Sequence, residues 1–475
     1  MPDYISANLD ESVAYFNQAL AVEDNFDIIY RVVNFGGRKA CIYFIDGFVK
    51  DEIMQKLMQN FGSMTPEQTP KNSYDMLKGF MPYIEVDLLR DKQQIIDNIL
   101  SGVTCMLVDG YEDAIAIDCR TYPARGVGEP EKDKVMRGSR DGFVETLVFN
   151  TALIRRRIRS TDLTMEMYQA GRSSKTDIVL CFMKGRVDEK FLNVIRQRIQ
   201  QIDVDALTMN QQSLAECLYK HHWFNPFPKF KFSERPDTAA ASVLEGNLIV
   251  LVDTSPSAMI LPTSIFDIVE EADDYYFPPI TGTYLRFSRF LINIIALVLT
   301  PLFLLLTNHP DWIPGGFEFI MVKDTMNIPL IWQFLILELA IDGLRLAALN
   351  TPSMLSTPLS VTAGLVIGEF TVSSGWFNSE AMLYMAFVAI ANYTQSSYEL
   401  GYAIKFLRII SLILTWFFDV WGFAAGMLLA VLAIATNRTI AGKSYIYPLI
   451  PFNARRLLRH MFRISLPKSE KKKAQ

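Results

Sequence analysis

The stretch "RKACIYFIDGFVKDEIMQKLMQNF" (Arg38–Phe61) has the same pattern as "KTDIVLCFMKGRVDEKFLNVIRQRI" (Lys175–Ile199). Each is an apolar run, then a glycine, then a stretch with apolar residues at helical spacing, which predicts a strand, a turn and a helix. Gly47 aligns with Gly185 without a gap around the turn. We therefore predict that one α/β unit occurs twice in the first part of the chain.

A second pair of segments follows in the same order. "ILSGVTCMLVDGYEDAIAID" (Ile99–Asp118) resembles "VLEGNLIVLVDTSPSAMILP" (Val243–Pro262), and both predict a strand, a polar turn and a strand, the pattern of a β-hairpin. Two similar elements in one order favour a duplication, although a chance likeness of such patterns is the alternative. We expect a first cytoplasmic α/β subdomain in residues 1–120 and a similar second one in residues 161–279.

Residues 121–160 concentrate arginines, although the net charge of the chain is -5. Proline and glycine break regular structure at first, and helical spacing resumes from Asp141. We expect an arginine-rich linker and helix at a subdomain or subunit interface, with these residues: Arg137, Arg140, Glu145, Arg155, Arg156 and Arg157. An ion-pair network that includes Glu129 and Glu131 is the favoured form. A solvated helix end and contact with a partner or anionic lipid are the alternatives.

The same segment carries a family resemblance. "YPARGVGEPEKDKVMRGSRDGFVETLVFNTALIRRR" (Tyr122–Arg157) is similar to the signature of the GerA/SpoVAF family, the A subunits of spore germination receptors. Three later segments agree in their order, so the resemblance covers nearly the whole chain. They are "FNPFPKFKFSERPDTAAASVLEGNLIVLVDTSPSAMILP" (Phe224–Pro262), "EADDYY" (Glu271–Tyr276) and "GLVIGEFTVSSGW" (Gly364–Trp376). Within the family, the chain is closer to the SpoVAF branch than to nutrient receptor subunits.

The resemblance implies a multi-pass protein of the spore inner membrane whose relatives assemble as pentameric ion channels in germination. It implies a homo-oligomer that contacts membrane lipid, with a small membrane subunit and other germination proteins as partners. The chain departs from the receptor pattern at "DGLRLAALNTP" (Asp342–Pro352), where receptor subunits carry a stretch like "ELLREAGLRLP". Asp342 and Arg345 match that stretch, but Leu346 replaces its second acidic residue.

Catalytic and metal-binding motifs are absent from the sequence. It has no Walker A loop, no G-x-S-x-G elbow and no HExxH, and its cysteines show no CxxC spacing, which favours reduced, packed thiols. The five cysteines are Cys41, Cys105, Cys119, Cys181 and Cys217. The acidic net charge does not favour nucleic acid. We expect no enzyme activity, no cofactor, no metal and no nucleic-acid partner.

Long apolar runs dominate the chain from Phe290 onward. "FLINIIALVLTPLFLLLT" (Phe290–Thr307) follows Arg286 and Arg289, so the positive-inside rule places its start in the cytoplasm. We expect an all-α polytopic transmembrane domain of four to six helices in residues 280–440 and a basic cytoplasmic tail in residues 441–475. The first residues lack the features of a signal peptide, so both termini should face the cytoplasm, which is the core of a spore.

Ionisable residues within the apolar segments indicate the functional site. Glu338, Asp342 and Arg345 fall at i, i+4 and i+7 on one helix face, and such charges must face protein or water. An intrahelical pair of Asp342 with Arg345 and a role in an ion path are equally favoured. Glu369 lies beside a stripe of small residues, Gly364, Gly368 and Gly375. Such glycines allow close helix packing, and a ring of Glu369 carboxylates lining a pore is the preferred interpretation.

These observations lead to one expected function and two alternatives. We expect a channel-forming subunit of a pentameric ion channel that releases cations during germination. A non-conducting scaffold has a similar sequence and differs only in the role of the membrane charges. A nutrient germinant receptor A subunit that signals to other germination proteins is the second alternative. A secondary transporter is disfavoured, because the apolar region shows no internal repeat.

Overall fold

The computed structural model describes residues 3–121, 137–219, 223–324, 327–350, 364–395 and 397–464. The chain divides into two compact units. The first unit comprises residues 1–221 and 230–262, and the second comprises residues 222–229 and 263–475. The sequence analysis ended the second subdomain at residue 279, whereas the contacts place residues 263–279 in the second unit. The reason is that the helices of this segment pack on the helix that follows them.

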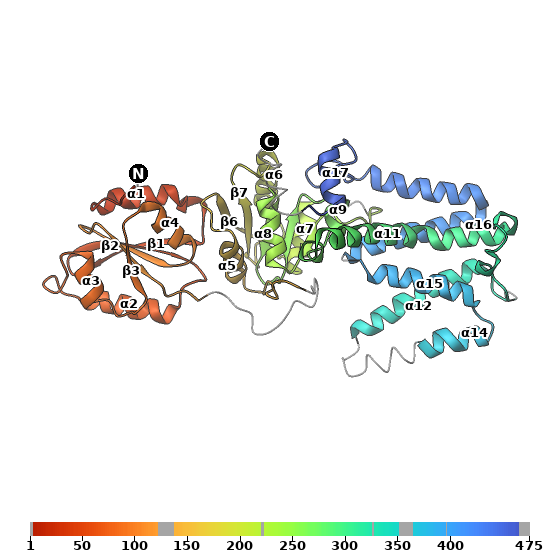
Figure 1. Ribbon diagram of the computed structural model, residues 1–475, viewed down its shortest axis with the longest axis horizontal. Coiled ribbons are helices and arrows are strands. Elements are labelled where there is room, and N and C mark those ends of the chain that lie inside the picture. The colour runs from red at the N-terminus through yellow and green to blue at the C-terminus, as the bar shows by residue number, and fades with distance from the viewer. Residues whose placement is uncertain are drawn as a thin grey trace. The chain divides into compact units, whose positions relative to one another are not determined.

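The first subdomain is an antiparallel sheet between two layers of helices (Figure 1). Its strand order is β1 (Ile28–Phe35), β2 (Arg38–Ile45), β4 (Thr104–Val108), β5 (Ala114–Ile117) and β3 (Val86–Leu89). Its helices are α1 (Leu9–Ala19), η1 (Val22–Asp24), α2 (Asp51–Ser63), α3 (Ser73–Gly79) and α4 (Lys92–Leu100). Cys41 and Tyr43 of β2 pack in the core beneath α1 and α4, and Ile42 packs in the core beneath α2. Because helices cover both faces of the sheet, successive residues of β2 from Ala40 to Ile45 are all apolar and do not alternate with polar ones.

The second subdomain repeats the first. Its strand order is β6 (Leu163–Ala170), β7 (Thr176–Met183), β9 (Leu248–Val252), β10 (Ala258–Leu261) and β8 (Lys231–Ser233). Its helices are α5 (Leu147–Arg157), α6 (Glu189–Gln200), α7 (Asn210–Leu218) and α8 (Pro236–Leu244). Helices and strands follow one another along the chain as they do in the first subdomain, so the predicted pair of similar α/β subdomains is confirmed.

Matching hydrogen bonds support the duplication in detail. The carboxylate of Asp109, after β4, accepts the backbone N–H of Leu9 at the start of α1 at 3.3 Å. The carboxylate of Asp253, after β9, accepts the N–H of Leu147 at the start of α5 at 3.2 Å. Therefore α5 is the counterpart of α1 and belongs to the second subdomain. The sequence analysis had assigned it to the linker, since helical spacing alone does not show on which sheet a helix packs.

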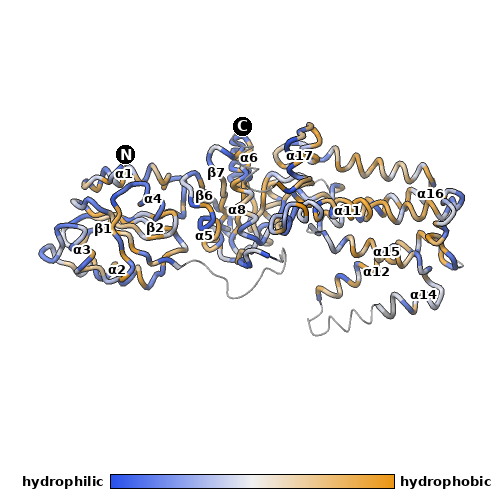
Figure 2. Tube along the Cα trace, viewed as in Figure 1, coloured by the Kyte–Doolittle hydropathy of each residue, from blue (hydrophilic) through white to orange (hydrophobic). Residues whose placement is uncertain are grey.

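In the described part of the second unit, the regular elements are all helices, apart from an isolated bridge between Arg438 and Ser444. The helices are α9 (Ile265–Val269), α10 (Asp273–Tyr276), α11 (Pro279–Asn308), η2 (Pro310–Trp312), η3 (Glu318–Ile320), α12 (Leu330–Asn350), the π-helical η4 (Gly364–Phe370), α14 (Thr371–Ser373), α15 (Ser379–Tyr393), α16 (Tyr398–Ala435) and α17 (Ala454–Met461). Among the described helices, α11 and α16 are long and apolar enough to cross a membrane by length and composition. Figure 2 shows both as predominantly hydrophobic.

The long helix α16 is a hairpin of two helices. Asp419 leaves the helical conformation at φ 51° and ψ -125°, and the chain reverses there (Figure 1). A Cβ added to Gly422 would lie 1.9 Å from the carbonyl oxygen of Leu414, and one on Gly426 would lie 2.5 Å from Ser411 Oγ. Because Gly422 and Gly426 lie this close to Leu414 and Ser411, the second half of α16 must run back along the first half. The segment Tyr398–Ala435 therefore contains two apolar helices, while a polytopic arrangement in a membrane stays a prediction.

Candidate functional site

Four ionisable side chains form a charge cluster among the apolar helices: Glu338, Asp342, Lys405 and Arg408. Glu338 of α12 is 3% exposed and Arg408 of α16 is fully buried. Arg408 donates from Nε to Glu338 Oε1 at 2.7 Å. Lys405 Nζ lies 3.3 Å from Glu338 Oε2 and also pairs with Asp342. The cluster therefore joins two acidic groups of one helix to two basic groups of another, and its formal charge is zero.

Helix geometry explains why these groups meet. Glu338 and Asp342 are four residues apart on α12, and Lys405 and Arg408 are three apart on α16, so each pair lies on one helix face. Backbone carbonyls complete the hydrogen bonds: Arg408 Nη1 donates to Ala296 of α11 at 2.8 Å, and Lys405 Nζ donates to Glu338 O at 3.2 Å. Because buried charges are costly unless paired, the cluster holds three helices in one register.

The pairing differs from the intrahelical pair that the sequence analysis considered. Asp342 pairs with Lys405, whereas Arg345 lies over the rings of three tyrosines in a cation–π arrangement. Its guanidinium is 5.8 Å from the Tyr393 centroid, 4.5 Å from Tyr398 and 5.3 Å from Tyr402.

Sequence reasoning missed the two basic residues of the cluster. Lys405 and Arg408 stand three residues apart inside an otherwise apolar segment. That spacing was the available signal, since cations in such a segment need anions on a neighbouring helix.

Glu369 lies apart from the charge cluster. Its side chain is exposed on the π-helical segment η4, and among the described residues no ion pair or hydrogen bond of its carboxylate is found. A Cβ on Gly364 or Gly368 would meet no atom of the described residues within 4 Å, so these glycines present an open face to that part of the chain. Gly375 does not share that face, because it lies in a turn at φ 74°, where Asn327 donates to its carbonyl oxygen at 2.9 Å.

Arg155 joins the two α/β subdomains. It is fully buried and donates to Asp27 of the first subdomain through Nε at 2.8 Å and Nη2 at 2.9 Å. Its Nη2 also donates to Asn25 Oδ1 at 3.2 Å. This bidentate geometry suits a guanidinium and not an ammonium. The sequence analysis named no partner in the first subdomain, because Asp27 is 128 residues from Arg155.

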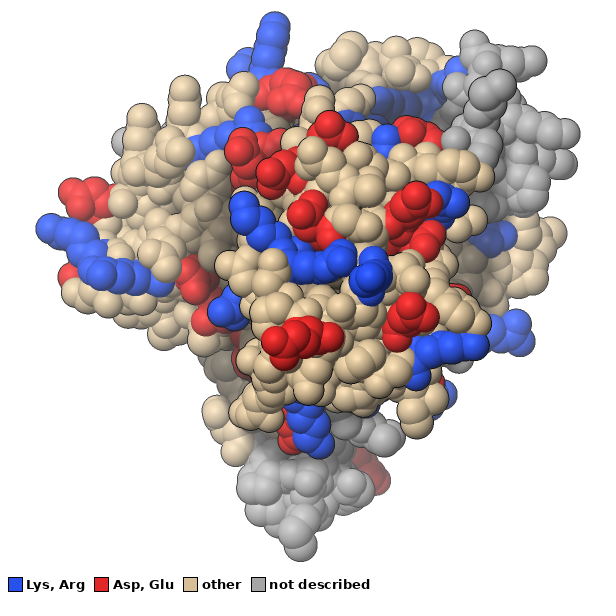
Figure 3. Space-filling view, turned by 90° about the vertical axis from the view of Figure 1, so that its left-hand side faces the viewer, with Lys and Arg blue, Asp and Glu red and all other residues tan. Residues whose placement is uncertain are grey.

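The other residues predicted at this interface lie nearer the surface. Arg157 pairs with Asp141 at 2.5 Å. The remaining predicted interface residues, all exposed, are Arg137, Arg140, Glu145 and Arg156. The predicted partners Glu129 and Glu131 lie outside the described residues. On the face of the molecule in Figure 3, acidic and basic side chains are interspersed.

A cavity of 880 Å³ lies between the two subdomains in the first unit. It is lined by Asp46 and Lys50 after β2 and by residues before and on α5, among them Asp141 and Phe149. Burial raises the pKa of Asp46 above its usual value, although a hydrogen bond from the Gly47 backbone opposes this; the neighbouring carboxylates of Asp27 and Asp51 raise it further.

The start of α11 is surrounded by carboxylates. Arg286 is buried beside Asp274 at 3.2 Å and also pairs with Glu270 at 2.5 Å, and Arg289 lies 2.7 Å from Asp274. These are the two arginines on which the positive-inside argument rests. Their salt bridges fix α10 against α11.

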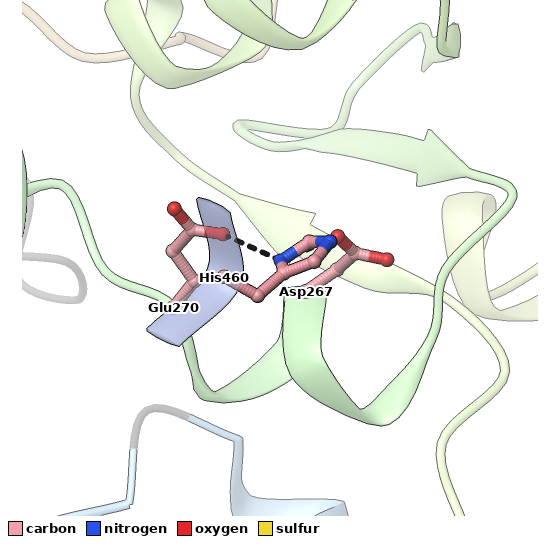
Figure 4. A group of neighbouring side chains, drawn as sticks. All are labelled: Asp267, Glu270 and His460. Atoms are coloured by element: carbon pink, nitrogen blue, oxygen red, sulfur yellow. Dashed lines mark ion pairs between the residues drawn. The ribbon is translucent and has the colours of Figure 1, made fainter. Parts of the chain in front are cut away.

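His460 of α17 lies beside Glu270, one of the carboxylates that pair with Arg286 (Figure 4). Its Nδ1 lies 3.5 Å from Glu270 and 4.0 Å from Asp267 of α9. Burial acts to lower the pKa of His460, but the hydrogen bond with Glu270 and the two carboxylate charges outweigh it, so the pKa is raised. The three side chains have the spacing of a metal site. Arg286 beside Glu270 opposes a further cation there, so we assign ion pairing to this group.

The fold and the charge cluster define a class: a protein with a duplicated α/β region and a region of apolar helices that bury charged groups between them. Comparison with known sequences then places it. The chain belongs to the GerA family, whose model, described as Bacillus/Clostridium GerA spore germination protein, matches residues 14–475. The resemblance carried by the arginine-rich signature is thus confirmed.

Individual relatives cover nearly all of the chain. Stage V sporulation protein AF of Bacillus subtilis (strain 168) is 34% identical over 474 residues, which are 98% of this chain and 96% of that protein. Spore germination protein KA of the same strain is 25% identical and covers 99% of this chain and 87% of its own length. The N-terminal domain of the A subunit of the Bacillus megaterium spore germinant receptor GerK3 matches at 23% identity with a TM-score of 0.41, over 55% of this chain and 97% of that domain.

Proposed function

We propose that this chain is the channel-forming subunit of a homo-oligomeric, pentameric ion channel in the spore inner membrane, which releases cations during germination. Membership of the GerA family supports a role in germination, and the two apolar helices support a location in a membrane. The observation that carries the proposal is the exposed carboxylate of Glu369 within an apolar stretch, beside the open faces of Gly364 and Gly368.

The charges of the second unit have different roles in this proposal. Glu338 and Asp342 are paired with Lys405 and Arg408, so they hold helices together and are not free to bind a passing ion. Glu369 would cost at least about 2.5 kcal/mol if its carboxylate faced lipid at the centre of a bilayer. Neighbouring subunits that pack on the two glycines would place one Glu369 from each copy around a common axis. Such a ring of carboxylates favours cations.

Both termini face the spore core in this arrangement, and the protein does not act as an enzyme. The first unit would then lie on the core side together with the basic tail. Thiol labelling from the outer side of intact membranes tests this orientation. A Ser6→Cys variant should resist an impermeant reagent until the membrane is opened, and labelling before opening would reverse the assignment.

The cavity between the two subdomains favours a second candidate function. Its 880 Å³ volume is the size of a small-molecule site, as a nutrient germinant receptor A subunit would need. Asp46 and Asp51 in its lining suit a ligand with a cationic group, and Lys50 beside them suits an acidic group on the same ligand. Under this alternative, a ligand in the first unit acts on the helices and the chain signals to other germination proteins.

Cation flux from proteoliposomes that contain the full chain tests the proposed channel. Glu369→Gln should reduce the flux while leaving oligomer mass unchanged, because it removes the charge and keeps the shape. Glu318→Gln is the matched control, since Glu318 is exposed in the loop between α11 and α12. Gly368→Leu should instead prevent assembly. Unchanged flux in an assembled Glu369→Gln variant would remove Glu369 from the ion path, and a full chain that shows no flux at all would favour the non-conducting scaffold.

A further inference from the structure

The short helix α17 presents an amphipathic surface. Leu458 is 53% exposed and Phe462, directly after the helix, is 46% exposed. They are four residues apart and lie on one face, with exposed Arg455 at its edge. His460 points the other way, toward α9 (Figure 4). The helix "ARRLLRHM" contains three arginines and no acidic residue. Its outward face is therefore apolar with a cationic rim.

Contacts within the second unit fix where α17 lies along α11. The N–H of Arg463 donates to Thr283 Oγ1 at 3.1 Å, and Arg286 donates to the carbonyl oxygen of Arg459 at 2.9 Å. The uncharged run of α11 begins at Phe290. With a helical rise of 1.5 Å per residue, these contacts lie about 5 to 10 Å from its start. Helices that lie in a membrane interface occupy this level.

The apolar face of α17 continues onto α11. Exposed apolar residues of α11 recur at helical spacing along one side: Ile280, Tyr284, Phe287 and Leu291. The ring of Phe462 lies edge-on to that of Phe287, with 5.6 Å between their centroids. The two helices thus share one apolar surface that begins at α17 and leads toward the apolar run of α11.

We propose that α17 is an interfacial anchor that binds the surface of an anionic bilayer. Leu458 and Phe462 enter the boundary of the acyl chains, and Arg455 contacts lipid phosphates. The proposal rests on the membrane location proposed above and adds a lipid contact that the channel does not require. Charge complementarity selects anionic lipid, because the exposed rim is arginine only and apolar residues of α11 extend the same surface.

Nitroxide accessibility in nanodiscs tests the anchor in the full chain. Leu458→Cys is labelled in a Cys217→Ser background, since the other four cysteines are buried. The nanodiscs contain phosphatidylcholine alone or with phosphatidylglycerol. With phosphatidylglycerol, the label should be accessible to oxygen and protected from a water-soluble nickel chelate. Arg455→Gln should reverse that protection, and the loss should be several-fold in the accessibility ratio. Arg456→Gln is the matched control, because Arg456 lies over the Tyr447 ring and is four residues from His460 on the opposite face.

Leu291→Cys is the control that separates this inference from the membrane location. A lipid signal at 291 and a water signal at 458 in both lipids would overturn the anchor and leave the membrane location standing. Water signals at both positions would overturn the membrane location itself. Protection of 458 from both reagents would indicate a protein contact, either a second copy or another partner, and would also overturn the lipid anchor.

Discussion

Glu338 Oε1 of α12 accepts a hydrogen bond from Arg408 Nε of α16 at 2.7 Å, and both side chains are buried among apolar residues. In lipid, apolar side chains give helices little reason to choose one register, since the acyl chains are equally apolar. A buried ion pair does give such a reason, because any other register would leave two charges unpaired. We infer that this pair sets the packing of α12 against the hairpin α16.

Removing one partner of that pair should be more harmful than removing both. Arg408→Met leaves Glu338 with Lys405 alone in a buried site and should lower stability by about 3–5 kcal/mol. The double variant Glu338→Leu with Arg408→Met should recover most of this loss, while the pair of Lys405 with Asp342 remains. SDS-induced unfolding of the full chain in mixed micelles measures the stability loss of the single variant and of the double variant. Additive losses in the double variant would refute a coupled pair.

The hairpin of α16 depends on two glycines. Gly422→Ala would place a Cβ 1.9 Å from the carbonyl oxygen of Leu414, so the two halves must separate. We expect a clear fall in the melting temperature. Gly343→Ala in α12 is the control, because a Cβ there meets nothing within 4 Å and alanine favours a helix by about 1 kcal/mol over glycine. Equal melting temperatures for the two variants would contradict the hairpin.

Arg155 and Arg156 are neighbours with opposite environments. Arg155→Met leaves Asp27 buried without its cation and should cost about 3–5 kcal/mol. Arg156→Met changes an exposed side chain, so its effect should stay within about 0.5 kcal/mol. Hydrogen exchange of α5 in the full chain reports the difference. If the amides of α5 are equally protected from exchange in both variants, Arg155 does not hold the subdomains together.

The attachment of α17 should weaken as the pH rises. The pKa of His460 is raised above 6.5, so its ion pairs with Asp267 and Glu270 are fully present below pH 6.5. They are lost as the pH passes through the raised value, because the imidazole becomes neutral. Arg286, which also faces Glu270, stays charged throughout. Amide exchange of α17, corrected for intrinsic rates, should therefore speed up with pH. The His460→Gln variant should show no such dependence, and an unchanged pH profile in that variant would exclude His460 as the cause.

Much of the fold could be predicted from local patterns. The alternation of apolar runs, glycines and helical spacing around Gly47 and Gly185 was sufficient to predict a duplicated α/β unit, because each pattern lies within about 25 residues of sequence. The apolar segments of the second unit were found in the same way, since a run without charges is itself the signal. The family could be named from one arginine-rich signature.

The candidate site could be predicted only in part. Glu338 and Asp342 were singled out by the cost of charge in an apolar helix, but their partners were not, because Arg408 is 70 residues from Glu338. The small-residue stripe included Gly375, which the structure places in a turn. One-dimensional spacing treats all three glycines as helical, whereas Gly375 ends the helical segment at φ 74°, where the N–H of Trp376 donates to the carbonyl oxygen of Thr371.

The sequence by itself therefore determined the repeat, the family and the two acidic residues of the charge cluster, all of which follow from composition, local periodicity or a local signature. Only the tertiary structure decided which charges pair. Asp342 is bound by Lys405 and not by Arg345, Arg155 is bound by Asp27, and α16 turns back at Asp419. The physical reason is that a buried ion takes whichever opposite charge the packed helices and sheets bring within reach, and packing depends on residues far apart in the chain.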